Sequence, residues 1–303
     1  MTFSVNGQET LPVDPQRLLG VELPEIQTPL TVTYLAAVHK DRRDFDPSWD
    51  RVIAEADTVL HEEAGWRPEN RLALNRVANG TSKDARMWAP DTKSYFRRRL
   101  DAITGTRVTQ GFWDVSASQM QELGLSDMLN SYHAKYVEAE DLLKQGDTDT
   151  ALDVMASAHM QLATYDTARD SIGLQTVADT LKDIGQDKSD EPAKIVVMAG
   201  LAHVYQAAAL SRKLSGQAQD VRVKSLITNP FGVGHISYAR YLSHEDSTRE
   251  ETAKQWLINL LHQHEAAKSS YLSATNIFNA VQAKVESISD DEAVATLLRT
   301  AKP

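Results

Sequence analysis

Three side chains that can activate water follow three predicted strands of this sequence. His39 ends the apolar segment LTVTYLAAVH, Glu62 follows the segment TVLH, and His203 follows the segment IVVMAG. The carboxyl ends of parallel strands meet at one edge of a sheet, and ligands usually bind there. Two imidazoles and a carboxylate are suited to general base catalysis, or to holding a divalent metal that acidifies a bound water. We therefore predict a catalytic or metal-binding cleft at this edge.

Other ionisable residues lie close to these positions. Glu63 is adjacent to Glu62, but neighbouring strand residues point to opposite faces, so only one of the two can easily face the cleft. His235, in the segment NPFGVGH, follows a further predicted strand and is a candidate for substrate binding together with Glu63. His61 should point away from Glu62 and have a structural role. A simpler interpretation of each histidine is a helix cap or a hydrogen bond to a backbone carbonyl.

The elements that must position this cleft are two β-α-β units. The first has strands at residues 30–39 and 58–61 with a helix from Trp49 between them. The second has strands at AKIVVMAG and DVRVKSLIT, separated by a helix. Helical spacing dominates residues 70–190, where the turn KQGDTD joins a tetratricopeptide-like helix pair and His159 lies on an apolar helix face as a core residue.

The whole pattern predicts an α/β fold. A mostly parallel sheet is built from two β-α-β halves flanked by helices, with a large helical insertion at 70–190 and a helical tail at 243–303, all in one domain of residues 1–303. In the tail, STRE (Ser247 and Glu250) and SDDE (Ser289 and Glu292) have the form of capping boxes. The pair His262 and His264 has i, i+2 spacing, which places the two on different sides of a helix and argues against a metal site.

Composition excludes several functional classes. The chain has 303 residues, no cysteine and a formal net charge of −10, so thiol nucleophiles, disulfides and iron–sulfur clusters are excluded and nucleic-acid binding is not expected. The basic run FRRRL (97–99) is typical of a solvated helix face. No signal peptide and no run of eighteen apolar residues is present, so we expect a cytoplasmic protein that does not bind membranes. Homo-oligomer formation is left open.

The motifs resemble those of one superfamily. The A-x-x-H of residues 36–39, the glutamate Glu62, the pair Arg169 and Asp170 and the G-x-x-H of residues 200–203 are similar in order and rough spacing to the motifs of TraB and TIKI proteins, ChaN-like proteins and erythromycin esterases. The resemblance covers residues 31 to about 227. Ala36 stands where that superfamily has glycine, and the G-E-x-x-H variant of erythromycin esterases and ChaN-like proteins is absent, which argues against macrolide hydrolysis and haem binding.

The resemblance implies a hydrolase. It suggests that a peptide or ester bond is cleaved by water activated at His39, Glu62 and His203, and that a divalent metal (Mn, Zn, Co or Fe) is bound by these three residues. Arg169 would hold Glu62 or a substrate oxyanion, and Asp170 would help to bind the peptide or small-molecule substrate. Two alternatives remain: a non-catalytic protein that binds a peptide or small ligand in the cleft or on the helical insertion, and a purely helical adaptor.

Overall fold

The computed structural model describes most of the chain. The described residues are 2–5, 8–12, 29–37, 39, 42–80, 93–184, 193–200, 203, 206–207, 209–211, 221–227, 247–268 and 274–300. We expect one domain from the sequence; in the structure the residues group into two compact units. The first comprises Met1–Asp14, Leu123–Thr167 and Asn229–Pro303, and the second comprises Pro15–Glu122 and Ala168–Thr228.

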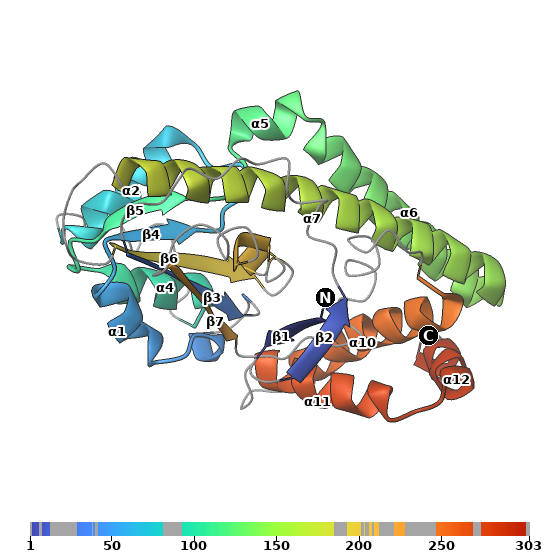
Figure 1. The fold of residues 1–303 in the computed structure, drawn as a ribbon. Helices are drawn as coiled ribbons and strands as arrows, with labels where there is room; N and C mark the ends of the chain where they lie inside the picture. The colour runs from blue at the N-terminus through green and yellow to red at the C-terminus, as the bar shows by residue number, and fades with distance from the viewer. Residues whose placement is uncertain are drawn as a thin grey trace. The chain divides into compact units, whose positions relative to one another are not determined.

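The second unit contains a five-stranded parallel sheet (Figure 1). Its strands are β3 (Leu30–Ala37), β4 (Thr58–His61), β5 (Thr109–Phe112), β6 (Ala193–Gly200) and β7 (Val221–Ile227), in the spatial order β5-β4-β6-β3-β7. The predicted α/β class with a mostly parallel sheet is therefore confirmed. Because a sheet is present, the purely helical adaptor is excluded.

One strand of this sheet was not predicted. The spacing of residues 70–190 predicts helices almost throughout, but Thr109–Phe112 is β5, which pairs with β4 at the edge of the sheet. Its sequence TQGF has one β-branched residue and a glycine, so it lacks the apolar run that marks the other strands. Gly111 is needed there, since a Cβ at this position would lie 2.9 Å from the side chain of Leu60.

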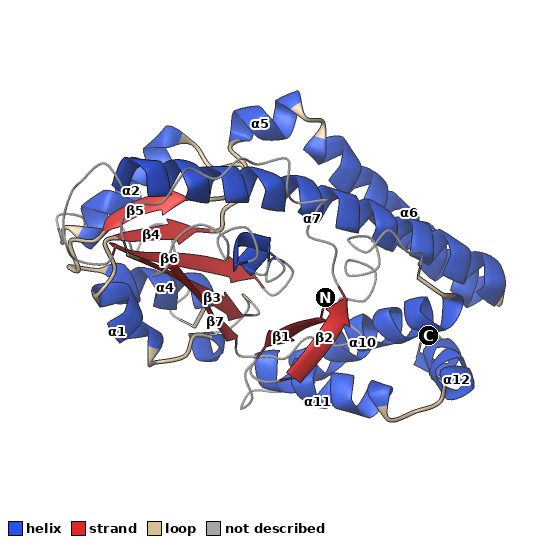
Figure 2. Ribbon diagram, viewed as in Figure 1, coloured by secondary structure: helices blue, strands red, loops and turns tan. Residues whose placement is uncertain are grey.

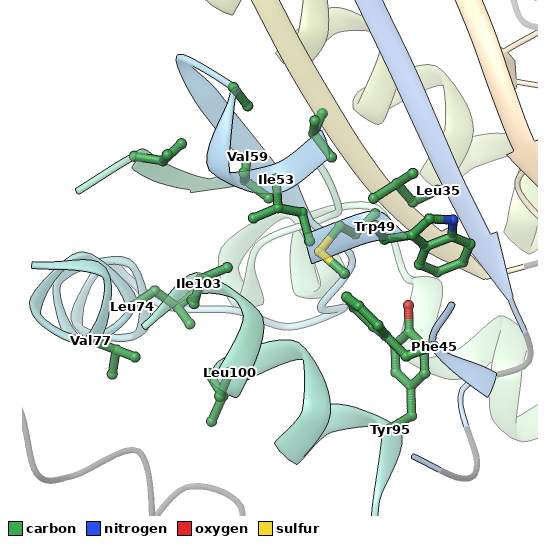
Figure 3. Packing of buried hydrophobic residues seen from close by; sticks show 14 of the residues in the cluster. Leu35, Phe45, Trp49, Ile53, Val59, Leu74, Val77, Tyr95, Leu100 and Ile103 are labelled. Carbon is green, nitrogen blue, oxygen red and sulfur yellow. The ribbon is translucent and has the colours of Figure 1, made fainter. Parts of the chain in front are cut away.

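Helices cover both faces of the sheet. The first face packs against the helices α1 (Trp49–Ala54), α2 (Pro68–Ala78) and α4 (Tyr95–Ile103), and the 3-10 turn η2 (Arg42–Asp44) contacts α4. Figure 3 shows the core at this face, in which Phe45, Trp49, Ile53, Leu74 and Leu100 are buried with Leu35 and Val59 of the strands. The other face packs against the second half of helix α7 (Thr148–Ile184), where Gly173 lies against Trp113.

The first unit is largely helical (Figure 2). It contains the antiparallel pair β1 (Thr2–Val5) and β2 (Gln8–Pro12), the helix α6 (Leu125–Gln145), the first half of α7, and the helices α10 (Arg249–Lys268), α11 (Ala274–Glu286) and α12 (Asp290–Thr300). The short helix α5 (Ala117–Glu122) precedes α6 in the chain and belongs to the second unit. The predicted turn between α6 and α7 is present, and Gly146 caps α6 with a φ of 88°.

Candidate active site

Four neighbouring strands end in ionisable side chains at the carboxyl edge of the sheet. Across the sheet order, Asp114 follows β5, Glu62 follows β4, His203 follows β6 and His39 follows β3. The predicted residues His39, Glu62 and His203 are thus brought together, at the edge where open α/β sheets usually bind ligands. Both histidines contact Glu62, so the two imidazoles lie within about 10 Å of each other, the scale of one shared pocket.

The carboxylate of Glu62 is the centre of the site. Its Oε1 accepts a hydrogen bond from Nη2 of Arg169 at 3.0 Å and lies 3.3 Å from Nε2 of His203. Its Oε2 accepts the backbone N–H of Gly200 and lies 3.9 Å from Nδ1 of His39. Burial alone would raise the pKa of Glu62, but the positive charges of His203 and Arg169 outweigh it and hold that pKa well below its usual range. Glu62 is therefore ionised at neutral pH.

His203 lies between two carboxylates. Its Nδ1 is 2.7 Å from Oδ1 of Asp170 and its Nε2 faces Glu62, while the ring of Trp113 packs edge-on at 5.0 Å. Burial lowers the pKa of His203, but the negative charges of Glu62 and Asp170 raise it well above the usual value. The ring is then an imidazolium that donates to both carboxylates. Since only 1% of its side chain is exposed, His203 is not placed to touch a substrate.

Arg169 holds Glu62 from helix α7. Its Nε and Nη2 donate to the two oxygens of Asp114 at 3.0 Å and 2.5 Å, and Nη2 also donates to Glu62. This bidentate pair fixes the guanidinium plane and places its charge against the carboxylate. Of the two roles predicted for Arg169, the geometry shows the contact with Glu62. Asp170, the next residue of the helix, contacts His203 and is fully buried, so it orients the imidazolium rather than lining a cleft.

His39 is the accessible imidazole of the site. Its side chain is 27% exposed, and its ring stacks on Tyr95 with centroids 4.3 Å apart and an interplanar angle of 16°. Loss of hydration lowers the pKa of His39, and the charge of Glu62 opposes this effect while the charge of Arg99 adds to it. The net result is a pKa below the usual 6.5. His39 is therefore neutral at pH 7 whereas His203 is charged. The two imidazoles therefore differ in protonation state, and the accessible one is the neutral base.

The remaining predicted residues lie elsewhere. The side chain of Glu63 is 44% exposed and pairs with Nη2 of Arg99 at 3.4 Å. His235 lies outside the described residues. His61 is fully buried, its Nε2 is 2.7 Å from Oε1 of Gln110, and burial lowers its pKa to about 3, in agreement with a structural role. His159 is buried as expected of a core residue.

The predicted metal finds little support in this geometry. Both oxygens of Glu62 already accept hydrogen bonds, and the Arg169 guanidinium next to Oε1 would repel a cation. A carboxylate on Nδ1, such as Asp170 on His203, often orients a histidine whose Nε2 binds a metal. In this site, however, Nε2 of His203 faces Glu62. Among the described residues, no group of three or more His, Cys, Asp or Glu side chains could hold a metal ion. We therefore derive no chemical step through a metal.

Three further residues of the site were not predicted. Asp114 belongs to no motif, and the strand that places it was missed. Tyr95 supports His39, and Arg99 donates from Nη1 to the backbone carbonyl of Glu62 at 3.1 Å. The run FRRRL predicts a solvated face, which is wrong for Arg99 because only 3% of its side chain is exposed. A signal was present: in a helix, residues 95 and 99 are one turn apart and share a face.

Comparisons with family models, with curated proteins and with solved structures find no match to this chain. None of the helices in the described part of the chain is long and apolar enough to cross a membrane.

Proposed function

We propose that the protein is a hydrolase that cleaves a peptide or ester bond with water activated by His39. The observation that supports this most strongly is the pair of imidazoles on opposite oxygens of Glu62, one neutral and partly exposed and the other charged and buried. A general base must be deprotonated and within reach of water, and His39 meets both conditions. The motif resemblance to peptidases and esterases agrees with this reaction class.

The reaction uses His39 twice. Its neutral ring nitrogen takes a proton from a water molecule as the water oxygen attacks the carbonyl carbon of the substrate. The C–O or C–N bond to the leaving group then breaks, and the imidazolium of His39 returns the proton to the leaving oxygen or nitrogen, so that His39 is neutral again. Glu62, 3.9 Å from Nδ1, stabilises the positive charge that His39 carries between these two steps.

The buried residues position Glu62. Arg169, His203 and the N–H of Gly200 each donate to it, so the carboxylate has one fixed orientation before substrate binds. Such preorganised charge needs no rearrangement during the reaction. Because its pKa is held low, Glu62 stays ionised and acts on the charge of His39 rather than taking the proton itself.

Substitution of His39 tests the proposal. A panel of p-nitrophenyl esters and fluorogenic peptides is screened with the wild-type protein in buffer containing a chelator. In His39→Ala we expect kcat/KM to fall by about 10²–10⁴, as is typical for loss of a general base. The matched control is His133→Ala, which removes an exposed histidine of α6 and should leave the rate unchanged.

The pH profile supplies an independent check. Because His39 must be neutral and its pKa is lowered from 6.5, kcat/KM should rise with an apparent pKa below 6.5 and stay level above it. An apparent pKa above 7 would contradict the assignment of His39 as base. Activity that is lost in chelator and restored by Mn²⁺ or Zn²⁺ would favour the metal-dependent reaction. A folded protein that binds ligands without hydrolysing any would be a binding protein.

A further inference from the structure

A cavity of about 280 Å³ lies beside the candidate active site. It is lined by Glu63, Asn70, Leu74, Phe96, Arg99 and Phe112, which come from the end of β4, from helices α2 and α4, and from β5. Half of this lining is aromatic or aliphatic, and the half-exposed Glu63 marks its connection to solvent. The volume is at the lower end of the range for ligand sites, so the cavity suits one small group of a substrate.

The lining places a buried cation against this apolar surface. Arg99 is only 2% exposed, and its guanidinium lies over the Phe96 ring at 4.4 Å. It donates to the carbonyl of Glu62 at 3.1 Å and to a carboxylate oxygen of Glu63 at 3.4 Å. The second contact is long for a charge-assisted hydrogen bond, and Glu63 is half exposed, so a ligand carboxylate can replace Glu63 while that side chain turns to water.

Arg99 also connects the cavity to the reacting groups. It donates to the backbone of Glu62 and lowers the pKa of His39, whose ring stacks on Tyr95, one helical turn before Arg99. The cavity and the reacting groups therefore share two neighbouring elements, the end of β4 at Glu62 and Glu63 and the helix α4 with Tyr95 and Arg99. We propose that the cavity is a substrate subsite for a small aromatic or branched aliphatic group that carries a carboxylate, with Arg99 as the anion-binding residue and Phe96 as the apolar wall.

The inference rests on the proposed function, because the cavity is a substrate subsite only if the protein is a hydrolase. Ligand binding in the cavity can nevertheless be measured without any activity assay. Phenylacetate and its neutral analogue phenylacetamide are titrated into the full-length protein, and binding is followed by ligand-observed NMR. We expect phenylacetate to bind about tenfold more tightly, since its carboxylate pairs with a guanidinium. Glu63→Gln should tighten phenylacetate binding and leave phenylacetamide unchanged, because it removes the competing carboxylate.

Two wall variants locate the ligand. Phe96→Ala should weaken both probes at least about fivefold, because it removes an aromatic wall. Ile184→Ala is the matched control, since Ile184 lines a separate cavity of about 270 Å³ on the α7 side. Circular dichroism establishes that both variants are folded. Equal affinity for the two probes, no effect of Glu63→Gln, or weakening by Ile184→Ala instead of Phe96→Ala would overturn the inference.

The two proposals can fail separately. If the wild-type protein hydrolyses no ester or peptide but shows the expected binding pattern, the subsite stands as a ligand site and the hydrolase proposal fails. If it hydrolyses esters at a rate that depends on His39 but the binding pattern is absent, the reaction stands and the subsite is wrong.

Discussion

Gly173 sets how closely helix α7 can approach the sheet, and its replacement by alanine is the most direct test of this architecture. A Cβ at position 173 would lie 2.3 Å from Nε2 of Gln206 and 2.5 Å from Cε3 of Trp113. Both distances are below 3.0 Å, which real Cβ atoms essentially never show. Because the indole of Trp113 is fully buried, either that ring or the helix must shift, and a shift of the helix would carry Arg169 and Asp170, one turn earlier, with it.

Two opposing effects determine the size of the change. Alanine favours the helix over glycine by about 0.8–1 kcal/mol. An extra carbon in a well-packed core costs about 1–3 kcal/mol, and the upper part of this range, about 2–3 kcal/mol, applies here because the new Cβ meets a fully buried indole ring. We expect Gly173→Ala to lower the free energy of unfolding by about 1–2 kcal/mol, and to lower kcat/KM as well because the contacts of Arg169 with Glu62 and of Asp170 with His203 are displaced.

Urea unfolding followed by circular dichroism measures the first effect, and the ester assay measures the second. Gln175→Ala, at an exposed position two residues along the same helix, is the control and should change the free energy of unfolding by less than about 0.5 kcal/mol. If Gly173→Ala is as stable as the wild type or more stable, α7 does not approach the sheet in the way that the structure shows.

Two further predictions concern other positions. In Gly200→Ala the new Cβ would lie 3.1 Å from Oε2 of Glu62, so the carboxylate must shift by a few tenths of an ångström. We expect kcat/KM to fall by about tenfold, with little change in the free energy of unfolding in urea. An unchanged rate would argue against a catalytic role of Glu62. Burial lowers the pKa of His159 to about 4, so the folded state resists protonation that the unfolded chain accepts below pH 6.5. The free energy of unfolding is therefore unaffected by His159 above pH 6.5 and falls as the pH drops toward 4, by up to about 3 kcal/mol. His159→Leu should remove that part of the pH dependence in urea titrations at pH 7, 5.5 and 4.5, and an unaltered dependence would show that His159 is not the titrating group.

Four of the predicted strands are confirmed, and three of them share one property. TVLH, AKIVVMAG and the first eight residues of LTVTYLAAVH are runs of apolar and β-branched residues, and such runs are typical of strands buried on both faces. β5 could not be recognised in this way, because as an edge strand it needs fewer apolar side chains. Local signals at helix starts were nearly as informative: Ser289 caps α12 as predicted, whereas the box expected at Ser247 and Glu250 lies one residue later, at Thr248 and Glu251.

Apart from Arg169 and Asp170, which the motif resemblance indicated, the site was predictable only where it depends on strand ends. The rule that parallel strands end at one edge places His39, Glu62 and His203 together without knowledge of their side-chain directions. The exposure of each side chain depends on packing from distant segments, so the sequence suggested a wet cleft around His203, whereas α7 and Trp113 enclose it. The role of Asp114 could not be predicted for the same reason, because it depends on Arg169, which lies 55 residues away in the chain.

The buried ion network is better explained by function than by stability. Asp114, Arg169, Glu62, His203 and Asp170 form a chain of alternating charges, each in contact with the next. Taking such charges out of water is costly, and apolar side chains of similar volume often stabilise a fold equally well or better. The formal charges of these five groups sum to −1, so the network favours one added positive charge nearby. His39 lies beside Glu62, the middle member of this chain, and a proton taken from water would supply that charge.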